Sequence, residues 1–183
     1  MDIALSDVPA WYVLQDLKPR NAKQKAYLQL LKKGFEVFTP LQWVVSVVHG
    51  KRVREQQPVI NDLLFVKTTR QQLDPVIKVT PTLRYRYFRG GKYCEPMIVP
   101  EWDMQRFMGV IGKSDAPVFF SPEEISPAIY GRKIRIIGGP FNGYEGSLLT
   151  TRGSRVKRLL VQLQGILVVG VEVAPEYIEL LEA

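Results

Sequence analysis

The sequence has a single cysteine, Cys94, and a single histidine, His49, among its 183 residues. One cysteine cannot form a disulfide within the chain, and a lone thiol fits a reducing environment. One cysteine and one histidine cannot assemble a cysteine-histidine metal site. A Ser-His-Asp catalytic site would have to use His49, which is predicted to be a solvated residue at a hairpin tip. We therefore expect a protein that is not an enzyme and that needs no metal or other cofactor.

Long hydrophobic runs are also missing. No apolar stretch approaches the roughly 20 residues that a membrane-spanning helix needs. Residues 1–7 lack the basic segment and apolar core of a signal peptide. The glycine pairs Gly90-Gly91 and Gly138-Gly139 lack the spacing and the following Ser or Thr of a phosphate-binding loop. We expect a soluble cytoplasmic monomer with no membrane partner.

Positive charge is what the chain has in excess. Its 25 Lys and Arg outnumber its 18 Asp and Glu, and the isoelectric point is about 9.5. Residues 1–112 contain 17 basic and 10 acidic side chains, whereas residues 113–130 contain one basic and three acidic. The excess predicts a polyanionic partner that is contacted mainly through the first part of the chain.

Hydrophobic periodicity divides the chain into two modules. In residues 1–112 the order β-α-β-β-β-α-β-α predicts an α+β fold with an antiparallel sheet. Residues 113–130, which hold three prolines, are predicted to be a linker. In residues 131–183, closely spaced strand signals favour a small β-barrel. The strands predicted there are 133–137, 147–151, 155–163, 166–173 and 177–181.

The first module has several well-marked elements. A helix is predicted from near Pro19 to the residue before Gly34, with a basic surface. His49-Gly50-Lys51-Arg52 is predicted to be a basic hairpin tip. The other predicted elements are strands at 11–14, 35–40, 44–48, 63–66 and 83–89 and helices at 71–78 and 101–112.

A glycine-rich segment follows the first strand of the second module. Ile134 and Ile136 alternate with Lys133 and Arg135, which is typical of a half-buried strand. Glycines then allow the positive backbone angles of a tight corner. The segment resembles the KOW motif of small SH3-like barrels, and its loop residues are Gly139, Pro140, Phe141, Gly143, Tyr144 and Gly146. Phe141 is either a plug of the barrel, which we favour, or a partner contact.

Several segments of the first module carry a family resemblance. They include Trp11-Tyr12-Val13-Leu14, Lys18-Pro19-Arg20, Gly34 to Pro40, Gly50-Lys51-Arg52 and Met97-Ile98-Val99-Pro100. Over about residues 10–182 the chain resembles the NusG family of transcription elongation factors. It is similar above all to the specialised RfaH and UpxY paralogues, antiterminators for long operons such as surface polysaccharide loci. The resemblance implies an NGN-type domain, a KOW domain, and a factor that binds RNA polymerase and suppresses pausing or termination.

The same resemblance implies a contact with the clamp helices of the polymerase. The residues implied, which are equally compatible with a hydrophobic core, are Val59, Ile60, Leu63, Phe65 and Phe107. One departure is clear: the family's usual Phe-Pro-Gly-Tyr or Phe-Pro-Asn-Tyr turn is replaced by Ile60-Asn61-Asp62-Leu63. Asn61 and Asp62 are still expected to make a turn.

Basic residues are the candidates for nucleic-acid contact. In RfaH-like factors the start of the first helix touches the displaced non-template DNA strand, which implies this role for Lys18, Arg20 and Lys23. Lys51 and Arg52 at the hairpin tip are further candidates. A basic surface that only keeps the protein soluble remains an alternative.

The second module is expected to recruit a further partner, either a ribosomal protein or a termination factor. A different function is also open: an RNA-binding or ribosome-binding KOW protein with no role at the polymerase.

Overall fold

The computed structural model describes residues 8–20, 22–88, 95–125, 131–163 and 165–181. The chain divides into two compact units, Met1–Glu101 and Trp102–Ala183. Cys94, Gly90-Gly91 and the last residue of the strand predicted over 83–89 lie outside the described residues.

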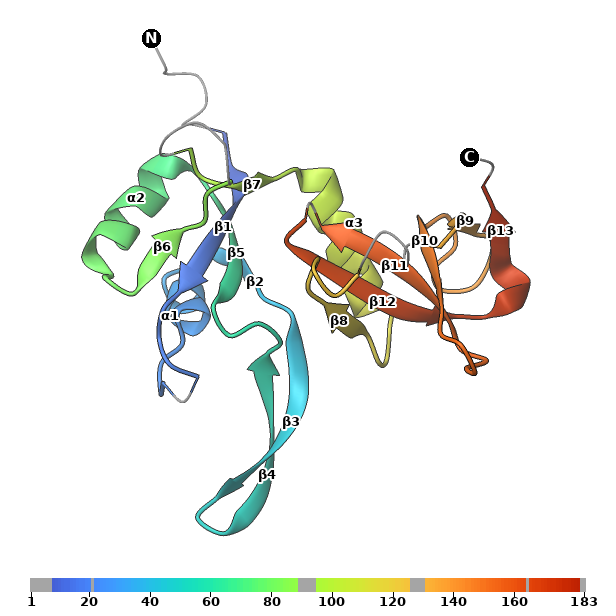
Figure 1. Cartoon of the computed structure of the whole chain (residues 1–183). Coiled ribbons are helices and arrows are strands. Elements are labelled where there is room, and N and C mark those ends of the chain that lie inside the picture. The colour runs from blue at the N-terminus through green and yellow to red at the C-terminus, as the bar shows by residue number, and fades with distance from the viewer. Residues whose placement is uncertain (1–7, 21, 89–94, 126–130, 164, 182–183) are drawn as a thin grey trace. The chain divides into compact units, whose positions relative to one another are not determined.

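The first unit is built on a five-stranded antiparallel sheet (Figure 1). The strand order is β2-β5-β1-β6, and β7 also pairs with β1. The central pair runs in register from Ala10 opposite Thr68 to Gln15 opposite Leu63. The five strands are β1 (Ala10–Asp16), β2 (Glu36–Phe38), β5 (Leu63–Thr68), β6 (Leu83–Tyr85) and β7 (Ile98–Val99).

One face of this sheet carries a hydrophobic core. Alternate residues of β1 and β5 point to this face, because the side-chain period of a strand is two. They pack against α1 (Ala26–Lys32) and α2 (Arg70–Val79), which confirms the helix predicted over 71–78. Buried members of this cluster are Tyr12, Leu14, Leu64, Val66, Ala26, Leu30 and Leu73.

The first helix is shorter than predicted, because α1 begins at Ala26 and not near Pro19. The buried carboxylate of Asp16, the last residue of β1, accepts hydrogen bonds from the backbone N–H groups of Ala26, at 2.9 Å, and Lys18, at 3.1 Å. The carboxylate therefore satisfies a donor that a helix start leaves without an internal partner. The residues before Ala26 form turns, such as the bond from the Ala22 N–H to the Pro19 carbonyl oxygen.

A separate two-stranded ribbon extends from the first unit (Figure 1). It consists of β3 (Leu41–Val48) and β4 (Lys51–Pro58), joined by a two-residue turn at His49 and Gly50. Both turn residues have positive φ, 50° and 75°. Two successive positive φ values are typical of a type I′ turn, whose twist matches that of the strands. The predicted hairpin tip is confirmed.

The second unit contains α3 (Glu101–Gly112, which starts one residue before the unit) and an antiparallel sheet of six strands. The sheet order is β13-β9-β10-β11-β12-β8. The predicted helix over 101–112 and the strands predicted in residues 131–183 are confirmed. The strands are β8 (Val118–Phe120), β9 (Lys133–Ile136), β10 (Glu145–Thr150), β11 (Lys157–Leu163), β12 (Leu167–Val173) and β13 (Ile178–Leu180).

Part of the predicted linker belongs to this sheet. β8 lies within residues 113–130 and pairs with β12, with Phe119 opposite Val169. Ile125, in the same stretch, is buried against Leu160 and Val168, and Phe120 packs on this cluster. The β domain of the second unit thus begins before residue 131, because apolar side chains of residues 113–130 complete its core. The predicted α+β class is confirmed.

Candidate nucleic-acid and protein interfaces

The three cations Lys18, Arg20 and Lys23 lie in the segment between β1 and α1, not in the first turn of a helix. We call residues 17–25 the basic loop. Arg20 and Lys23 are exposed, whereas Lys18 is half-buried and donates from Nζ to the Gln24 carbonyl oxygen at 3.1 Å. The structure thus brings all three together in one short loop, and Arg20 and Lys23 are the most accessible.

Asn61 holds the basic loop in place. Its side-chain nitrogen donates to the Lys18 carbonyl oxygen at 3.1 Å, and its Oδ1 accepts from Lys25 Nζ at 2.8 Å. Lys25 Nζ also donates to the Pro19 carbonyl oxygen at 3.0 Å. Burial lowers the pKa of Lys25, and the nearby Asp16 carboxylate opposes that shift. Sequence reasoning predicted only a turn at Asn61, because its hydrogen-bond partners are distant in sequence.

The turn Ile60-Asn61-Asp62-Leu63 is also hydrogen-bonded to β1. The Leu63 N–H donates to the Ile60 carbonyl oxygen at 3.2 Å, which closes the predicted turn. Asp62 accepts twice: its Oδ2 from the Gln15 side chain at 2.8 Å, and its carbonyl oxygen from the Asp16 N–H at 3.0 Å. The turn therefore links β5, β1 and the basic loop through hydrogen bonds.

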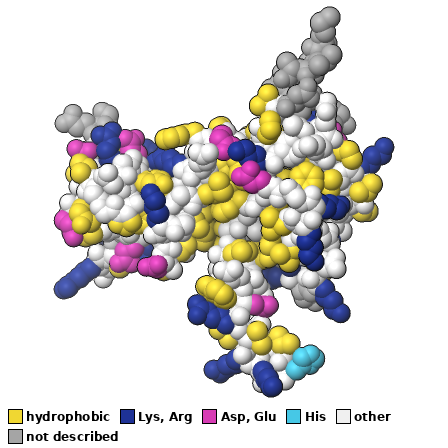
Figure 2. Space-filling view, turned by 180° about the vertical axis from the view of Figure 1, so that it is seen from behind, with side chains coloured by type: hydrophobic (Ala, Val, Ile, Leu, Met, Phe, Trp, Pro, Cys, Tyr) yellow, Lys and Arg dark blue, Asp and Glu magenta, His cyan; other side chains and the backbone are white. Residues whose placement is uncertain are grey.

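The ribbon presents two chemically different faces. Residues directly opposite in an antiparallel pair share a face. Val47 lies opposite Arg52, Val45 opposite Arg54, and Trp43 opposite Gln56. We call the face made by these six residues the arginine face. Figure 2 shows hydrophobic and basic side chains together along the ribbon.

Lys51 and Arg52, predicted together as nucleic-acid contacts, point to opposite faces of the ribbon, since they are consecutive in β4. Lys51 pairs with Val48 on the face opposite to the arginine face. Trp43 and Arg54 were missed as candidates. The two-residue turn at His49-Gly50 was the available signal, because it sets the register that places them on one face.

Three of the five predicted polymerase-binding residues are buried. Leu63 and Phe65 of β5 and Phe107 of α3 have 2%, 0% and 0% of their surface exposed. Val59 and Ile60 are half-buried and reach the surface. Buried side chains cannot touch a partner in this conformation, so this structure places Leu63, Phe65 and Phe107 in hydrophobic core.

The glycine-rich loop, residues 137–144, joins β9 to β10. Gly139 and Gly143 have φ of 66° and 81°, which favours glycine at both positions. Phe141 is buried, as a plug of the β domain would be, and its ring meets the Tyr144 ring edge-on with centroids 6.3 Å apart. Pro140 is exposed. Gly146 follows in β10, where a side chain would collide with the Leu160 carbonyl oxygen of β11.

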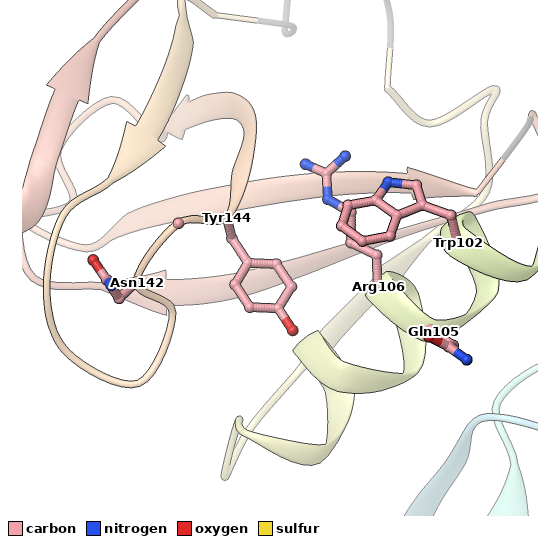
Figure 3. A pocket seen from close by; sticks show the side chains of 6 residues that line it. Trp102, Gln105, Arg106, Asn142 and Tyr144 are labelled. Atoms are coloured by element: carbon pink, nitrogen blue, oxygen red, sulfur yellow. The ribbon is translucent and has the colours of Figure 1, made fainter.

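A hollow of about 380 Å³ lies between α3 and the glycine-rich loop (Figure 3). Tyr144 points toward α3 in this view. Arg106 donates a hydrogen bond to the Glu145 carbonyl oxygen. Lys113 Nζ lies 4.8 Å from the centroid of the Tyr144 ring. The side chains that line the hollow belong to Trp102, Gln105, Arg106, Asn142 and Tyr144, with Gly143.

Among the residues that the structure describes, no three His, Cys, Asp or Glu side chains are grouped so that they could hold a metal ion. Within the same part of the chain, no helix has the length and apolar character needed to cross a membrane.

Comparison with known proteins gives one family. The family model described as "Transcription termination factor nusG" matches residues 9–108, more than half of the chain. The match spans the whole sheet of the first unit, the ribbon and most of α3. No curated protein matches the sequence.

Proposed function

The chain belongs to the NusG family, and from this membership we propose that it is an elongation factor that binds RNA polymerase and suppresses pausing or termination. The observation that carries the proposal is the family match over residues 9–108. We propose further that it is a specialised antiterminator of the RfaH or UpxY type, which serves particular long operons such as surface polysaccharide loci. It would act in the cytoplasm as a monomer.

The proposed polymerase contact is the end of β4 and the turn that follows it. Val59 and Ile60 supply accessible apolar surface there for the polymerase clamp helices. Leu63 and Phe65 of the first unit and Phe107 of the second are buried, so they would contact the polymerase only in a conformation that exposes them.

The proposed nucleic-acid contact is the basic loop together with the ribbon tip. Arg20 and Lys23 of the basic loop are exposed, as are Lys51 and Arg52 of the ribbon tip. Asn61 donates a hydrogen bond to the carbonyl oxygen of Lys18 in the basic loop. Cations of this kind bind phosphates through counterion release, so the affinity falls as salt rises. We propose that they hold the displaced non-template DNA strand. A clamp across the nucleic acid would favour the closed elongation state by shifting its population, without chemistry.

We propose that the second unit is a KOW domain that recruits a ribosomal protein or a termination factor through its glycine-rich loop. Pro140 and Gly143 at the loop surface are the residues for this contact, whereas Phe141 serves the core.

The decisive measurement is binding of the full chain to core RNA polymerase, with Ile60→Asp as the test variant. We expect the charge on this accessible apolar site to weaken binding at least about tenfold, because an unpaired charge is costly in an apolar contact. Val79→Asp is the matched control, since Val79 is 72% exposed on α2, away from the proposed contact.

Loss of binding in Ile60→Asp alone supports the polymerase contact, and read-through of a terminator in vitro then tests antitermination. Equal binding by wild type and both variants places the contact elsewhere. No polymerase binding by wild type contradicts the proposal and favours the RNA-binding or ribosome-binding alternative.

A further inference from the structure

The arginine face of the ribbon is uncovered over its whole β3 side. Trp43, Val45 and Val47 are 58%, 64% and 69% exposed. These large apolar side chains form one row, because they alternate along β3. At about 3.4 Å per residue the row extends for roughly 14 Å. A hydrophobic row that remains open to solvent is typical of an interaction surface.

A basic row lies beside the apolar one. Arg52 and Arg54 are exposed on β4, opposite Val47 and Val45. Among the described residues neither arginine forms an ion pair. The one carboxylate of the ribbon, on Glu55, points to the other face, where it accepts hydrogen bonds from the side chains of Ser46 and Gln57. The arginine face therefore carries two cations and no anion.

The two rows meet at Trp43. The Arg54 guanidinium lies 4.6 Å from the centroid of the indole ring. This contact places the cation over one face of the indole ring and limits the rotation of both side chains, so a base would stack on the other face of the ring. An aromatic ring beside cations is the combination by which proteins bind single-stranded nucleic acid, with bases on the ring and phosphates on the cations.

We propose that the arginine face binds a single strand of DNA, with one base stacked on Trp43 and the backbone phosphates held by Arg52 and Arg54. The two arginines are about 7 Å apart along β4, so they can hold separate phosphates of an extended strand. The assignment to DNA rests on the proposed function, which places the displaced DNA strand beside the factor.

The charge and shape of the surface favour this occupant over two others. A duplex keeps its bases stacked on each other, so it cannot offer a base face to Trp43, although a β-ribbon can enter a major groove. An apolar protein partner would not require two cations without counterions. Both occupants are outcomes of the test.

The test is the affinity of the full chain for a fluorescent oligothymidylate of about 12 nucleotides, measured by anisotropy at several salt concentrations. We expect Trp43→Ala to weaken binding about fivefold to 150-fold, the range for loss of one base stack. Arg52→Ala and Arg54→Ala should each reduce the slope of log K against log salt by about 0.7. Thermal unfolding of each variant checks that it is folded.

Two controls match these changes. Val53→Ala removes an apolar side chain that is 41% exposed on the other face of the same ribbon. Lys78→Ala removes an exposed cation from the last turn of α2. Both should bind the oligonucleotide like wild type, and an equal loss in either would show that the effect is not specific to the arginine face and overturn the proposal.

Binding of duplex DNA, RNA and polymerase is measured for comparison. Tighter binding of duplex DNA, or of the same sequence as RNA, would overturn the assignment to single-stranded DNA. Unchanged oligonucleotide binding in Trp43→Ala would overturn the stacking contact. Loss of polymerase binding in Trp43→Ala, with DNA binding intact, would make the arginine face a protein contact.

Failure here is distinguishable from failure of the proposed function. Oligonucleotide binding needs no polymerase, whereas Ile60→Asp reports on polymerase binding alone. A wild-type chain that binds polymerase but no oligonucleotide contradicts only the proposal for the arginine face.

Discussion

The hydroxyl of Tyr85 lies beside the Asp74 carboxylate, at the edge of the hydrophobic core of the first unit. Tyr85 donates to Asp74 Oδ1 at 2.7 Å, and its ring packs near Tyr12 with centroids 5.8 Å apart. Burial, followed by the hydrogen bond to Asp74, raises the pKa of Tyr85 well above its ordinary value. Burial also raises the pKa of Tyr12 and Tyr27.

This shift predicts a loss of stability at alkaline pH. Above about pH 10 the unfolded chain releases the tyrosine proton while the folded chain retains it, so the free energy of unfolding falls as pH rises. Below that pH the tyrosine is neutral in both states, and its full contribution to the free energy of unfolding is present. Tyr85→Phe should unfold more easily at neutral pH, since it loses a hydrogen bond, and its stability should fall less steeply above pH 10.

Urea unfolding of wild type and Tyr85→Phe between pH 8 and pH 11 measures both effects. Some alkaline loss remains in the variant because Tyr12 and Tyr27 are still present. Parallel stability curves for the two proteins would contradict the role given to Tyr85.

Asn61, which departs from the turn sequence usual in the family, has a structural role in this chain. Its amide joins Lys18 and Lys25 through two hydrogen bonds, so the turn that departs from the family pattern also organises the basic loop. The replacement of the family tyrosine by Leu63 is thus only part of the difference. The position of Lys18, one of the proposed nucleic-acid contacts, depends on the same turn.

The ribbon depends on its two-residue turn, because an isolated two-stranded hairpin is marginally stable in water. Gly50 has φ of 75°, and a side chain there would meet no atom within 4 Å. Gly50→Ala therefore tests backbone strain alone, which costs roughly 1 kcal/mol in the left-handed region. His49→Asn should be tolerated, since asparagine adopts positive φ readily.

Amide hydrogen exchange, resolved by residue, measures this prediction. In Gly50→Ala we expect faster exchange of the ribbon amides, by about fivefold for a cost of roughly 1 kcal/mol. Amides of β1 and β5 serve as the internal control and should not change. Faster exchange throughout the first unit would show that the ribbon and the main sheet open together.

For the molecule as a whole, β8 marks where the β domain of the second unit begins. Phe120 packs on the buried Ile125, and both residues precede position 131. A fragment of residues 114–183 should therefore unfold at higher urea than one of residues 131–183. The expected difference in unfolding free energy is at least ~2 kcal/mol, since burial of one such side chain contributes about 1.5–3 kcal/mol.

Residues 114–183 with Ile125→Asp are the control for fragment length. If stability comes from core packing, this variant should resemble the shorter fragment. Equal stability of all three fragments would mean that residues 114–130 act only as a connection, as their proline content first suggested.

Much of the architecture could be predicted from local pattern. Strand β9 alternates in polarity, the basic hairpin tip holds a glycine, and α2 and α3 have the period of helices. Such signals act between near neighbours in the chain, so they are visible without a structure. Exposed cations such as Lys51 and Arg52 were also found in this way.

The candidate site was predicted less completely, because the register of strand pairing decides which side chains share a face of the ribbon. Trp43 and Arg54 are separated by ten other residues in the chain, and only strand pairing places them 4.6 Å apart. Burial is equally non-local, and Leu63 and Phe65 proved to be core residues although sequence alone left both interpretations open.

The sequence alone therefore determined the α+β class, the order of most elements and the positive charge of the first part of the chain, because propensity, period and charge belong to the residues themselves. Tertiary structure decided the start of α1 at Ala26, the entry of β8 into the sheet, and the arginine face of the ribbon. Each of these depends on a partner that is distant in sequence: the Asp16 carboxylate, strand β12, and the register across the ribbon.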